Sequence, residues 1–350
     1  MRTAAAVDLV RERALTRTEA RELFADILRQ PPAAEELSAL LQALAARGET
    51  ADEIAGAAEA MRGAMLPFEH DAPEAVDTCG TGGDSLGTFN LSTSAALVAA
   101  AAGVKIVKHG NRAASSRCGS ADLLEAAGVH LQLNPAQARV VFEECGFVFL
   151  FAPSFHPALG PIAPVRRALG IRTIFNFLGP LCNPGRVRRQ LLGVSDPARV
   201  ADYARVLGAL GCQRGTVVHG AGGADELTLD GPNLLIWIGG EGAIPRGGAS
   251  SLPAREFGLA RAPVSALAGG DAACNLKILQ EVLAGERGPM RDAVLLNATV
   301  AIYLGSLGDS KQTSLKDCFT RACVALDSRA AQSLLARVVK HSQAVAGVPA

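Results

Sequence analysis

The sequence predicts an α/β protein: a small N-terminal helical domain plus a larger α/β domain with a mostly parallel central sheet. Three observations support this class. Amphipathic helical patterns fill residues 1–70, short apolar strands alternate with helices from about residue 73, and helical patterns return after about residue 270. Strands that alternate with helices usually form parallel sheets. We expect a helical domain over 1–70, completed by part of a crossing segment at 155–190, and an α/β domain over 73–350.

The expected helical domain contains three short helices whose ends are marked in the sequence. Thr16 with Glu19 and Thr50 with Glu53 have the spacing of capping boxes, in which each side chain accepts a hydrogen bond from the other residue's backbone N–H. Two consecutive prolines and later Gly48 mark helix ends. Each helix carries an apolar stripe, and three short helices bury little by themselves. We expect the stripes to pack on the rest of the chain or on a second copy, and we predict a homodimer through this domain.

The α/β pattern begins with a strand that runs into a glycine-rich loop. Asn134 followed by Pro135 starts one helix, which Gly146 ends, and Ser120 is placed to cap another. A stretch rich in Pro and Gly at 153–184 is interpreted as a crossing between the lobes, and 231–270 as loops and strands. Strands are expected at 75–79, 104–108, 147–151, 190–194 and 216–219, and helices at 92–102, 123–127, 135–145 and 197–210.

The composition limits the classes of function. Lys plus Arg and Asp plus Glu number 34 each, and aromatic residues make up 4%, which argues against a dedicated nucleic-acid binder. No apolar run reaches the roughly 20 residues of a membrane helix, and the N-terminus lacks the pattern of a secretion signal. The eight cysteines form no C-x-x-C pair, which disfavours zinc and redox sites and favours free thiols in the cytoplasm.

Two polar motifs precede the predicted helix at 92–102. Residues 80–84 (Gly-Thr-Gly-Gly-Asp) follow a strand, and three glycines in four positions let backbone N–H groups approach a phosphate. The motif fits neither a dinucleotide fingerprint nor a P-loop. Residues 90–93 (Asn-Leu-Ser-Thr) stand where the helix begins, so their hydroxyls and free N–H groups suit an anion. An ordinary helix cap is the alternative for this second motif.

Two further polar segments also follow predicted strands. Residues 108–120 hold a Lys, an Asn, two Arg and several serines, and parallel sheets bind ligands outside the carboxyl ends of their strands. Asp225 and Glu226 follow the strand at 216–219 in a glycine-rich turn, where adjacent carboxylates suit magnesium. Solvated surface is the alternative for such a pair. Together the four segments offer phosphate donors, a cation and carboxylates for a metal.

In these segments the chain resembles the anthranilate phosphoribosyltransferases of the nucleoside phosphorylase-like transferase family. The likeness covers nearly the whole chain and is most specific at 108–128 and 165–184. It implies that family's fold and its reaction, which transfers the phosphoribosyl group of 5-phosphoribosyl 1-pyrophosphate to the amine of anthranilate in the second step of tryptophan biosynthesis from chorismate. The alternatives are a pyrimidine nucleoside phosphorylase-like enzyme and a non-catalytic paralogue that binds nucleic acid.

The resemblance also implies roles for individual residues. Magnesium, expected as two ions with phosphoribosyl pyrophosphate bound, has Ser92, Asp225 and Glu226 as ligands. Lys108 and the two acids are expected to support the transition state, and no residue is assigned as a general acid or base. The implied anthranilate contacts are Gly80, His109, Asn111 and Arg166. The implied phosphoribosyl pyrophosphate contacts are Gly80, Gly83, Asp84, Thr88, Asn90, Leu91, Ser92, Thr93, Lys108, His109, Gly110, Asn111, Arg112, Ala113, Ala114, Ser115, Ser116 and Ser120.

Three residues depart from the family's common pattern. Ser85 stands where Gly is common, Cys118 where Ser is common and Phe155 where Tyr is common. None of them removes a side chain with an assigned role, so we expect effects on rate and affinity rather than on the type of reaction. The expected partners are the two small-molecule substrates and a second copy of the chain, with no nucleic acid and no membrane.

Overall fold

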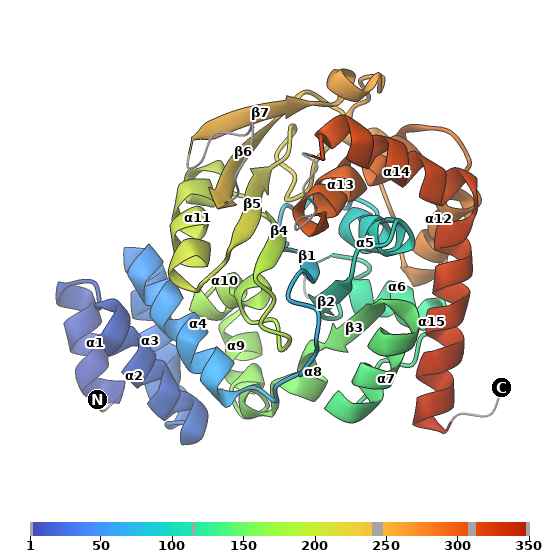
Figure 1. Cartoon of the computed structure of the whole chain (residues 1–350). Helices are drawn as coiled ribbons and strands as arrows, with labels where there is room; N and C mark the ends of the chain where they lie inside the picture. The colour runs from blue at the N-terminus through green and yellow to red at the C-terminus, as the bar shows by residue number, and fades with distance from the viewer. Residues whose placement is uncertain (1–2, 114–115, 240–247, 307–312, 348–350) are drawn as a thin grey trace.

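The computed structural model describes residues 3–113, 116–239, 248–306 and 313–347, and its centre is a seven-stranded sheet (Figure 1). The strand order is β3-β2-β1-β4-β5-β6-β7. The first five strands in this order pair in parallel, while β6 and β7 are antiparallel, so the predicted mostly parallel sheet is confirmed. The strands are β1 (Val76–Gly80), β2 (Ile106–Gly110), β3 (Phe147–Phe151), β4 (Arg189–Gly193), β5 (Arg214–His219), β6 (Pro232–Gly239) and β7 (Ala249–Pro253).

The N-terminal helices form a separate lobe at the left of Figure 1. They are α1 (Thr3–Glu12), α2 (Arg17–Arg29), α3 (Ala34–Arg47) and α4 (Ala51–Ala64). Both predicted capping boxes are present, at the starts of α2 and α4. The crossing segment adds α8 (Ala152–Phe155), α9 (Ala163–Leu169) and α10 (Ile174–Leu178), of which α9 packs on α3 and α10 on both α3 and α4.

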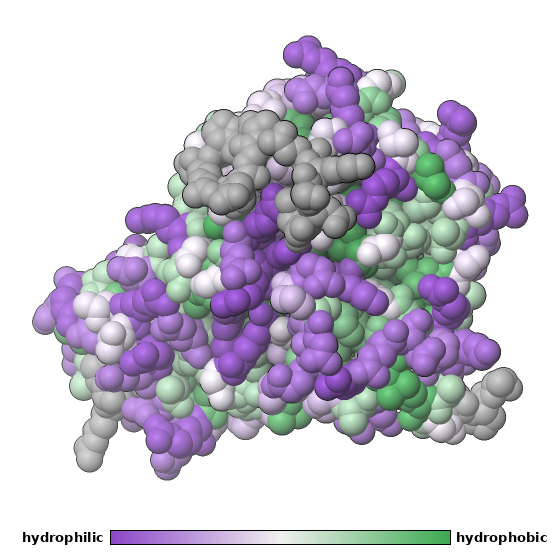
Figure 2. Space-filling view, viewed as in Figure 1, coloured by the Kyte–Doolittle hydropathy of each residue, from purple (hydrophilic) through white to green (hydrophobic). Residues whose placement is uncertain are grey.

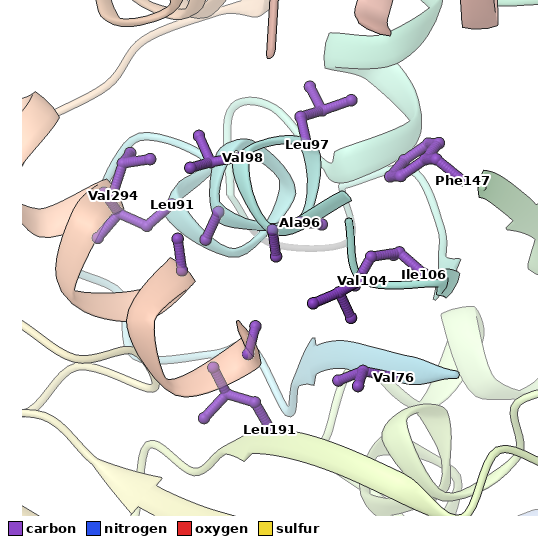
Figure 3. Close-up of a cluster of buried hydrophobic side chains, with 14 of the residues drawn as sticks. Val76, Leu91, Ala96, Leu97, Val98, Val104, Ile106, Phe147, Leu191 and Val294 are labelled. Atoms are coloured by element: carbon purple, nitrogen blue, oxygen red, sulfur yellow. The ribbon is translucent and has the colours of Figure 1, made fainter. Parts of the chain in front are cut away.

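One face of the sheet is covered by helices from the middle and the end of the chain (Figure 3). Val76 on β1 and Leu191 on β4 lie beneath Ala96 and Val98 of α5, and Val294 of α13 closes the cluster. The helices of this lobe are α5 (Leu91–Ala101), α6 (Ser120–Ala126), α7 (Pro135–Cys145), α11 (Val200–Ala209), α12 (Ala272–Leu283), α13 (Pro289–Gly305), α14 (Leu315–Asp327) and α15 (Ala330–Ala346).

The opposite face of the sheet packs against α11 and, through it, against the helical lobe. Side chains alternate along a strand, so Leu192 and Val217 belong to this second core while their neighbours Leu191 and Val218 belong to the first. The ring of Phe24 on α2 meets Phe175 on α10 edge to face, with centroids 5.7 Å apart. The second core therefore extends through both lobes, and the crossing segment is part of it.

The apolar stripes of the first helices are used inside the chain. The predicted stripe residues of α2 and α3 are all buried in the second core, for example Leu23 and Leu40 at 0% exposure. They pack on the crossing segment and α11. A homodimer would therefore need other faces of these helices than the stripes.

Among the described residues, no helix is long and apolar enough to span a membrane. The face in Figure 2 mixes hydrophilic and hydrophobic residues, with a hydrophilic band running down its middle. The large hydrophobic residues found exposed in the described ranges are Leu66, Val140, Ile171 and Val324, which lie on four separate elements or connections.

Candidate functional site

The predicted polar segments follow strands that are neighbours in the sheet. The loop 80–84 follows β1, the loop 108–120 begins within β2, and the turn that holds Asp225 and Glu226 follows β5. Because β2, β1, β4 and β5 are adjacent and parallel, their carboxyl ends meet at one edge of the sheet. Figure 1 shows these strands side by side, with α5 beside β1 and β2.

Asp225 lies directly on the glycine loop. Its Oδ2 accepts a hydrogen bond of 2.6 Å from the backbone N–H of Gly82. A Cβ at Gly80 would overlap the Asp225 carboxylate, and a Cβ at Gly193 would overlap the Asp225 carbonyl oxygen. Glycine at the ends of β1 and β4 therefore lets the acidic turn approach the sheet edge.

Glu226 connects the same turn to the start of α5. Its Oε1 accepts a hydrogen bond of 2.8 Å from the backbone N–H of Ser92, one of the N–H groups that a helix leaves unpaired in its first turn. Lys108 Nζ donates to the Thr78 carbonyl, and it lies 3.5 Å from Ser92 Oγ. The predicted magnesium ligands therefore lie together with the ammonium group of Lys108.

Three carboxylates gather here with little to neutralise them. Burial, followed by the charge of Asp84, raises the pKa of Asp225 to about 6. Burial, followed by the charge of Asp225, raises the pKa of Glu226 to about 8. Asp84 Oδ2 is buried and receives no hydrogen bond from the described residues. A cation between these oxygens would relieve both the burial and the repulsion.

The donor set fits magnesium better than a transition metal. Within the described ranges no group of three His, Cys, Asp or Glu side chains is arranged to hold a metal by itself. Magnesium keeps several waters and is held by one or two carboxylates together with a substrate's phosphates. Carboxylate oxygens next to a glycine-rich loop that is predicted to bind phosphate match that behaviour.

The raised pKa of Glu226 predicts a pH-dependent difference in stability. We expect the variant Glu226→Gln, without metal, to gain stability over the wild type as pH rises from about 4.5 to about 8. In that window the unfolded glutamate is ionised and the folded one keeps its proton, so rising pH destabilises only the wild type. The difference should reach a few kcal/mol, since one pKa unit corresponds to about 1.4 kcal/mol.

Chemical denaturation of both proteins near pH 5 and near pH 8 would measure this difference. The matched control is Glu256→Gln, which removes an exposed glutamate and should show no such trend. A constant difference between Glu226→Gln and the wild type across the window would contradict the perturbed ionisation.

A buried histidine pair joins the end of β2 to the crossing segment. His109 Nδ1 lies 3.1 Å from the Gly179 carbonyl, which only accepts, so this nitrogen carries the proton. His109 Nε2 then accepts from His156 Nε2 at 3.2 Å. Burial is the largest cause that lowers the pKa of His109 to about 3 and of His156 to about 4, so both rings are neutral near pH 7.

A second buried network lies beneath Lys108. Asp77 accepts hydrogen bonds from the Asn183 amide at 2.9 Å and from the His109 backbone N–H at 3.2 Å. Burial raises the pKa of Asp77 to about 6, while the nearby charge of Lys108 opposes that rise. The network fixes the end of β2, and with it Lys108 and His109, relative to β1 and the crossing segment.

Arg166 lies on α9 with its guanidinium 5.2 Å from the centre of the Phe175 ring. Its Nε is buried and has no hydrogen-bond partner within the described part of the chain, and burial lowers its pKa. A half-buried guanidinium whose Nε has no acceptor bears a desolvation cost that a paired anion would relieve. Arg166 is therefore placed to receive a carboxylate or phosphate.

The loop after β2 is organised mainly by α6. Arg112 forms ion pairs with Asp122 and Glu125, so its guanidinium is engaged with protein groups. Ser120 does not cap α6 as predicted, because Gly119 is the N-cap residue and Asp122 accepts from its N–H. Ser120 Oγ instead donates to the Asn111 carbonyl, which places it under the predicted ligand loop. The exposed Ser116 belongs to this loop, and the predictions for Ala114 and Ser115 fall outside the described residues.

The residues before and within the first turn of α5 divide into two groups. Leu91 is fully buried in the core, so a ligand reaches only its backbone. Asn90 is the N-cap residue but makes no cap hydrogen bond, and its side chain joins Cys118 to Asn275. Thr93 is also at 0% exposure, and its Oγ1 has no hydrogen-bond partner among the described residues. The other predicted contacts lie in the same loops: Gly83, Thr88, Gly110 and Ala113.

The three departures from the family pattern have distinct surroundings. Ser85 has φ of 59°, in the left-handed region that favours glycine, so a side chain here costs about 1–2 kcal/mol of backbone strain. Cys118 is buried beside Gly119. Phe155 is buried in the first core at 1% exposure. Of the three, Ser85 is adjacent to the cluster of carboxylates.

The contacts that hold the site from behind join residues far apart in the sequence. His156 contacts His109 across 47 positions of sequence, and Asn183 contacts Asp77 across 106. Asp77 was overlooked because it lies inside an apolar strand. The one available signal was a charged residue in such a strand, since a buried carboxylate needs partners.

Comparisons with known proteins identify the family of the chain. Residues 7–65 match the model of the glycosyl transferase family helical bundle domain, and residues 72–332 match the model of the glycosyl transferase family a/b domain. A protein of Roseiflexus castenholzii named anthranilate phosphoribosyltransferase is 47% identical over 337 residues, which are 96% of this chain and 97% of that protein.

Solved structures are similar over the same length. The crystal structure of anthranilate phosphoribosyltransferase from Thermus thermophilus superposes with a TM-score of 0.88 at 45% identity, and covers 97% of this chain and 99% of its own. The enzyme of the same name from Saccharomyces cerevisiae, in complex with PRPP and Mg, has a TM-score of 0.83 at 28% identity and 94% coverage of each chain.

Proposed function

We infer, because the chain belongs to the glycosyl transferase family and within it to the anthranilate phosphoribosyltransferases, that it catalyses their reaction at the carboxyl edge of its sheet. The chain is accordingly an enzyme that transfers a pentosyl group. The observation that carries the proposed site is the Asp225–Glu226 turn, which is hydrogen-bonded to the glycine loop through Gly82 and to α5 through Ser92. It brings two carboxylates between two phosphate-binding motifs.

In the proposed reaction the anthranilate nitrogen attacks C1 of phosphoribosyl pyrophosphate. The new bond is N–C1, the C1–O bond to pyrophosphate breaks, and pyrophosphate leaves with the electron pair, while the nitrogen releases its proton to water. The aromatic amine is neutral near pH 7 and nucleophilic as it stands. Burial lowers the pKa of His109 to about 3 and of His156 to about 4, so both are weak bases, and we propose catalysis mainly by positioning and electrostatics.

Magnesium, when bound, neutralises negative charge on the pyrophosphate group. We propose that Asp225, Glu226 and Ser92 hold two ions, and that Asp84, whose buried Oδ2 lacks a partner among the described residues, faces the same place. The S. cerevisiae relative with PRPP and Mg supports this cofactor. Lys108, close to Ser92 Oγ, adds a fixed positive charge toward the leaving group.

We propose that anthranilate binds between the end of β2 and the crossing segment. The Arg166 guanidinium would form two parallel hydrogen bonds with the anthranilate carboxylate. His109, Asn111 and Gly80 are the other proposed contacts. The proposal is supported by the partnerless Nε of Arg166 and by the His109–Gly179 contact between the two walls.

Anthranilate fluorescence gives the direct test. Purified protein with phosphoribosyl pyrophosphate and magnesium should remove the anthranilate signal, and it should not do so when magnesium or either substrate is left out. The loss of signal should match the pyrophosphate released. Absence of turnover at high enzyme concentration would contradict the proposed function, and phosphorolysis of nucleosides would be assayed next.

We also propose a homodimer through the helical lobe, a domain formed by residues 1–70 with part of 155–190, and a cytoplasmic location. The relatives' glycosyl transferase helical bundle supports the domain. Eight free thiols suit a reducing compartment. The apolar stripes of α2 and α3 are buried within the chain, so a dimer would use the outer faces of these helices. Analytical ultracentrifugation of variants substituted on those outer faces would test the dimer.

A further inference from the structure

A second arginine of the crossing segment reaches the glycine loop. Arg172, in the connection between α9 and α10, places its guanidinium so that a Cβ built on Gly83 would lie 3.2 Å from Nη1. The same guanidinium lies 5.5 Å from the centre of the Phe177 ring. Arg172 thus extends from the crossing segment to the loop that follows β1.

The charge of Arg172 is not neutralised by the protein. Arg172 is exposed and forms no ion pair with any acidic side chain of the described ranges. Its neighbour Arg199, whose guanidinium is 5.3 Å from the same Phe177 ring, donates to the Glu49 carbonyl and pairs with Asp202. Of these two guanidinium groups, the one next to the glycine loop is therefore available to a ligand.

Arg172 and Arg166 are held for different ligand groups. Arg166 stacks on Phe175 and Arg172 on Phe177 of the short helix α10. Two residues are about 200° apart around an α-helix, so the two rings, and the cations on them, lie on nearly opposite sides of α10. One ligand group would not bridge both cations.

We propose that Arg172 is a substrate-positioning residue that binds the pyrophosphate group of phosphoribosyl pyrophosphate at the glycine loop. This inference rests on the proposed function. A guanidinium pairs with phosphate oxygens in a fork, and Phe177 holds it in that orientation. Arg172 contributes charge at Gly83, while Asp225 lies at Gly80 of the same loop.

The test compares Arg172→Ala, Arg172→Lys and the control Arg167→Ala, which removes an exposed arginine of α9. We expect Arg172→Ala to raise the KM for phosphoribosyl pyrophosphate roughly tenfold, the size of one charge-assisted hydrogen-bonded pair, and to leave the KM for anthranilate unchanged. Arg172→Lys should recover only part of the affinity, because an ammonium keeps the charge but does not form the fork, and Arg167→Ala should behave as the wild type.

Calorimetry with magnesium and inorganic pyrophosphate as the probe separates this inference from the proposed function, because it needs no turnover. Weaker pyrophosphate binding by Arg172→Ala alone would support the role of Arg172, even if the wild type did not consume anthranilate. Equal binding by Arg172→Ala and wild type would overturn it. So would a rise in the KM for anthranilate instead, a lowered melting temperature with both KM values unchanged, or a wild type that binds no pyrophosphate.

Discussion

Turnover of anthranilate should fall by at least about 10³-fold when Asp225→Asn and Glu226→Gln are combined, which is the scale seen when a strong electrostatic contact to the transition state is lost. The two carboxylates are the only acidic side chains that the described structure ties by hydrogen bonds to both the glycine loop and α5. Without them the proposed site keeps only Ser92 of its three magnesium ligands, so we expect charge on the departing pyrophosphate to be poorly neutralised.

Rates measured over a magnesium titration would check this prediction. The matched control is the double variant Asp71→Asn and Glu143→Gln, which amidates two exposed carboxylates that both pair with Arg139. This control should keep the wild-type rate and the wild-type magnesium dependence. If the double variant at Asp225 and Glu226 kept most of the wild-type rate at the wild type's working magnesium concentration, the metal would have to be held elsewhere.

A folding defect is not the expected cause of that loss. Both acids are half-buried with raised pKa values, so their ionised forms oppose folding when no metal is bound. Their amides keep the shape without the charge, and the variant should be at least as stable as the wild type near pH 8. Stability and activity would therefore change in opposite directions, which a merely structural role for the two acids does not produce.

The location of the site was predictable because it depends on local signals and one rule of topology. Each polar segment follows a short apolar strand, and parallel strands bring their carboxyl ends to one edge. The acidic turn then accepts hydrogen bonds from the backbone N–H groups of Gly82 and Ser92. The residue types in the loops after the strands were therefore enough to predict that these segments meet.

The supporting contacts were not predictable in the same way. The His109–His156 pair depends on how the crossing segment returns over β2, and no local pattern encodes that path. Ser120 was wrongly assigned as a cap because a glycine can occupy the N-cap position when the third residue of the helix, Asp122, binds its N–H. Arg112 is a basic residue in a predicted ligand-binding loop, yet its guanidinium pairs with Asp122 and Glu125 of α6.

The same limit applies to the helical lobe. Its three predicted stripes required a partner surface, and the sequence left open whether this was the same chain or another. The structure uses them within the chain, with Phe24 against Phe175 and the stripe of α3 against the crossing segment and its neighbours. Amphipathic periodicity tells which face is buried but does not identify what buries it.

Replacing Arg166 by Ala should raise the KM for anthranilate about 10- to 100-fold, the range of a hydrogen-bonded charged pair, and leave the KM for phosphoribosyl pyrophosphate nearly unchanged. The guanidinium has a buried Nε without a partner in the described structure, and burial lowers its pKa. In the free protein the Arg166 cation is therefore partly desolvated, which raises its free energy, and a bound carboxylate would lower that free energy. Arg166→Lys should recover only part of the loss, because an ammonium does not form the fork.

A substrate change makes this prediction sharper. Aniline keeps the nucleophilic nitrogen and the ring of anthranilate but lacks the carboxylate, so the wild type should use it as poorly as Arg166→Ala uses anthranilate. Arg166→Ala should then lose almost nothing more on aniline, since the two changes remove the same interaction. Arg167→Ala, on the same helix, should use anthranilate as the wild type does. Equal losses of Arg166→Ala on both substrates, or an equal rise in the KM for phosphoribosyl pyrophosphate, would show that Arg166 does not bind the anthranilate carboxylate.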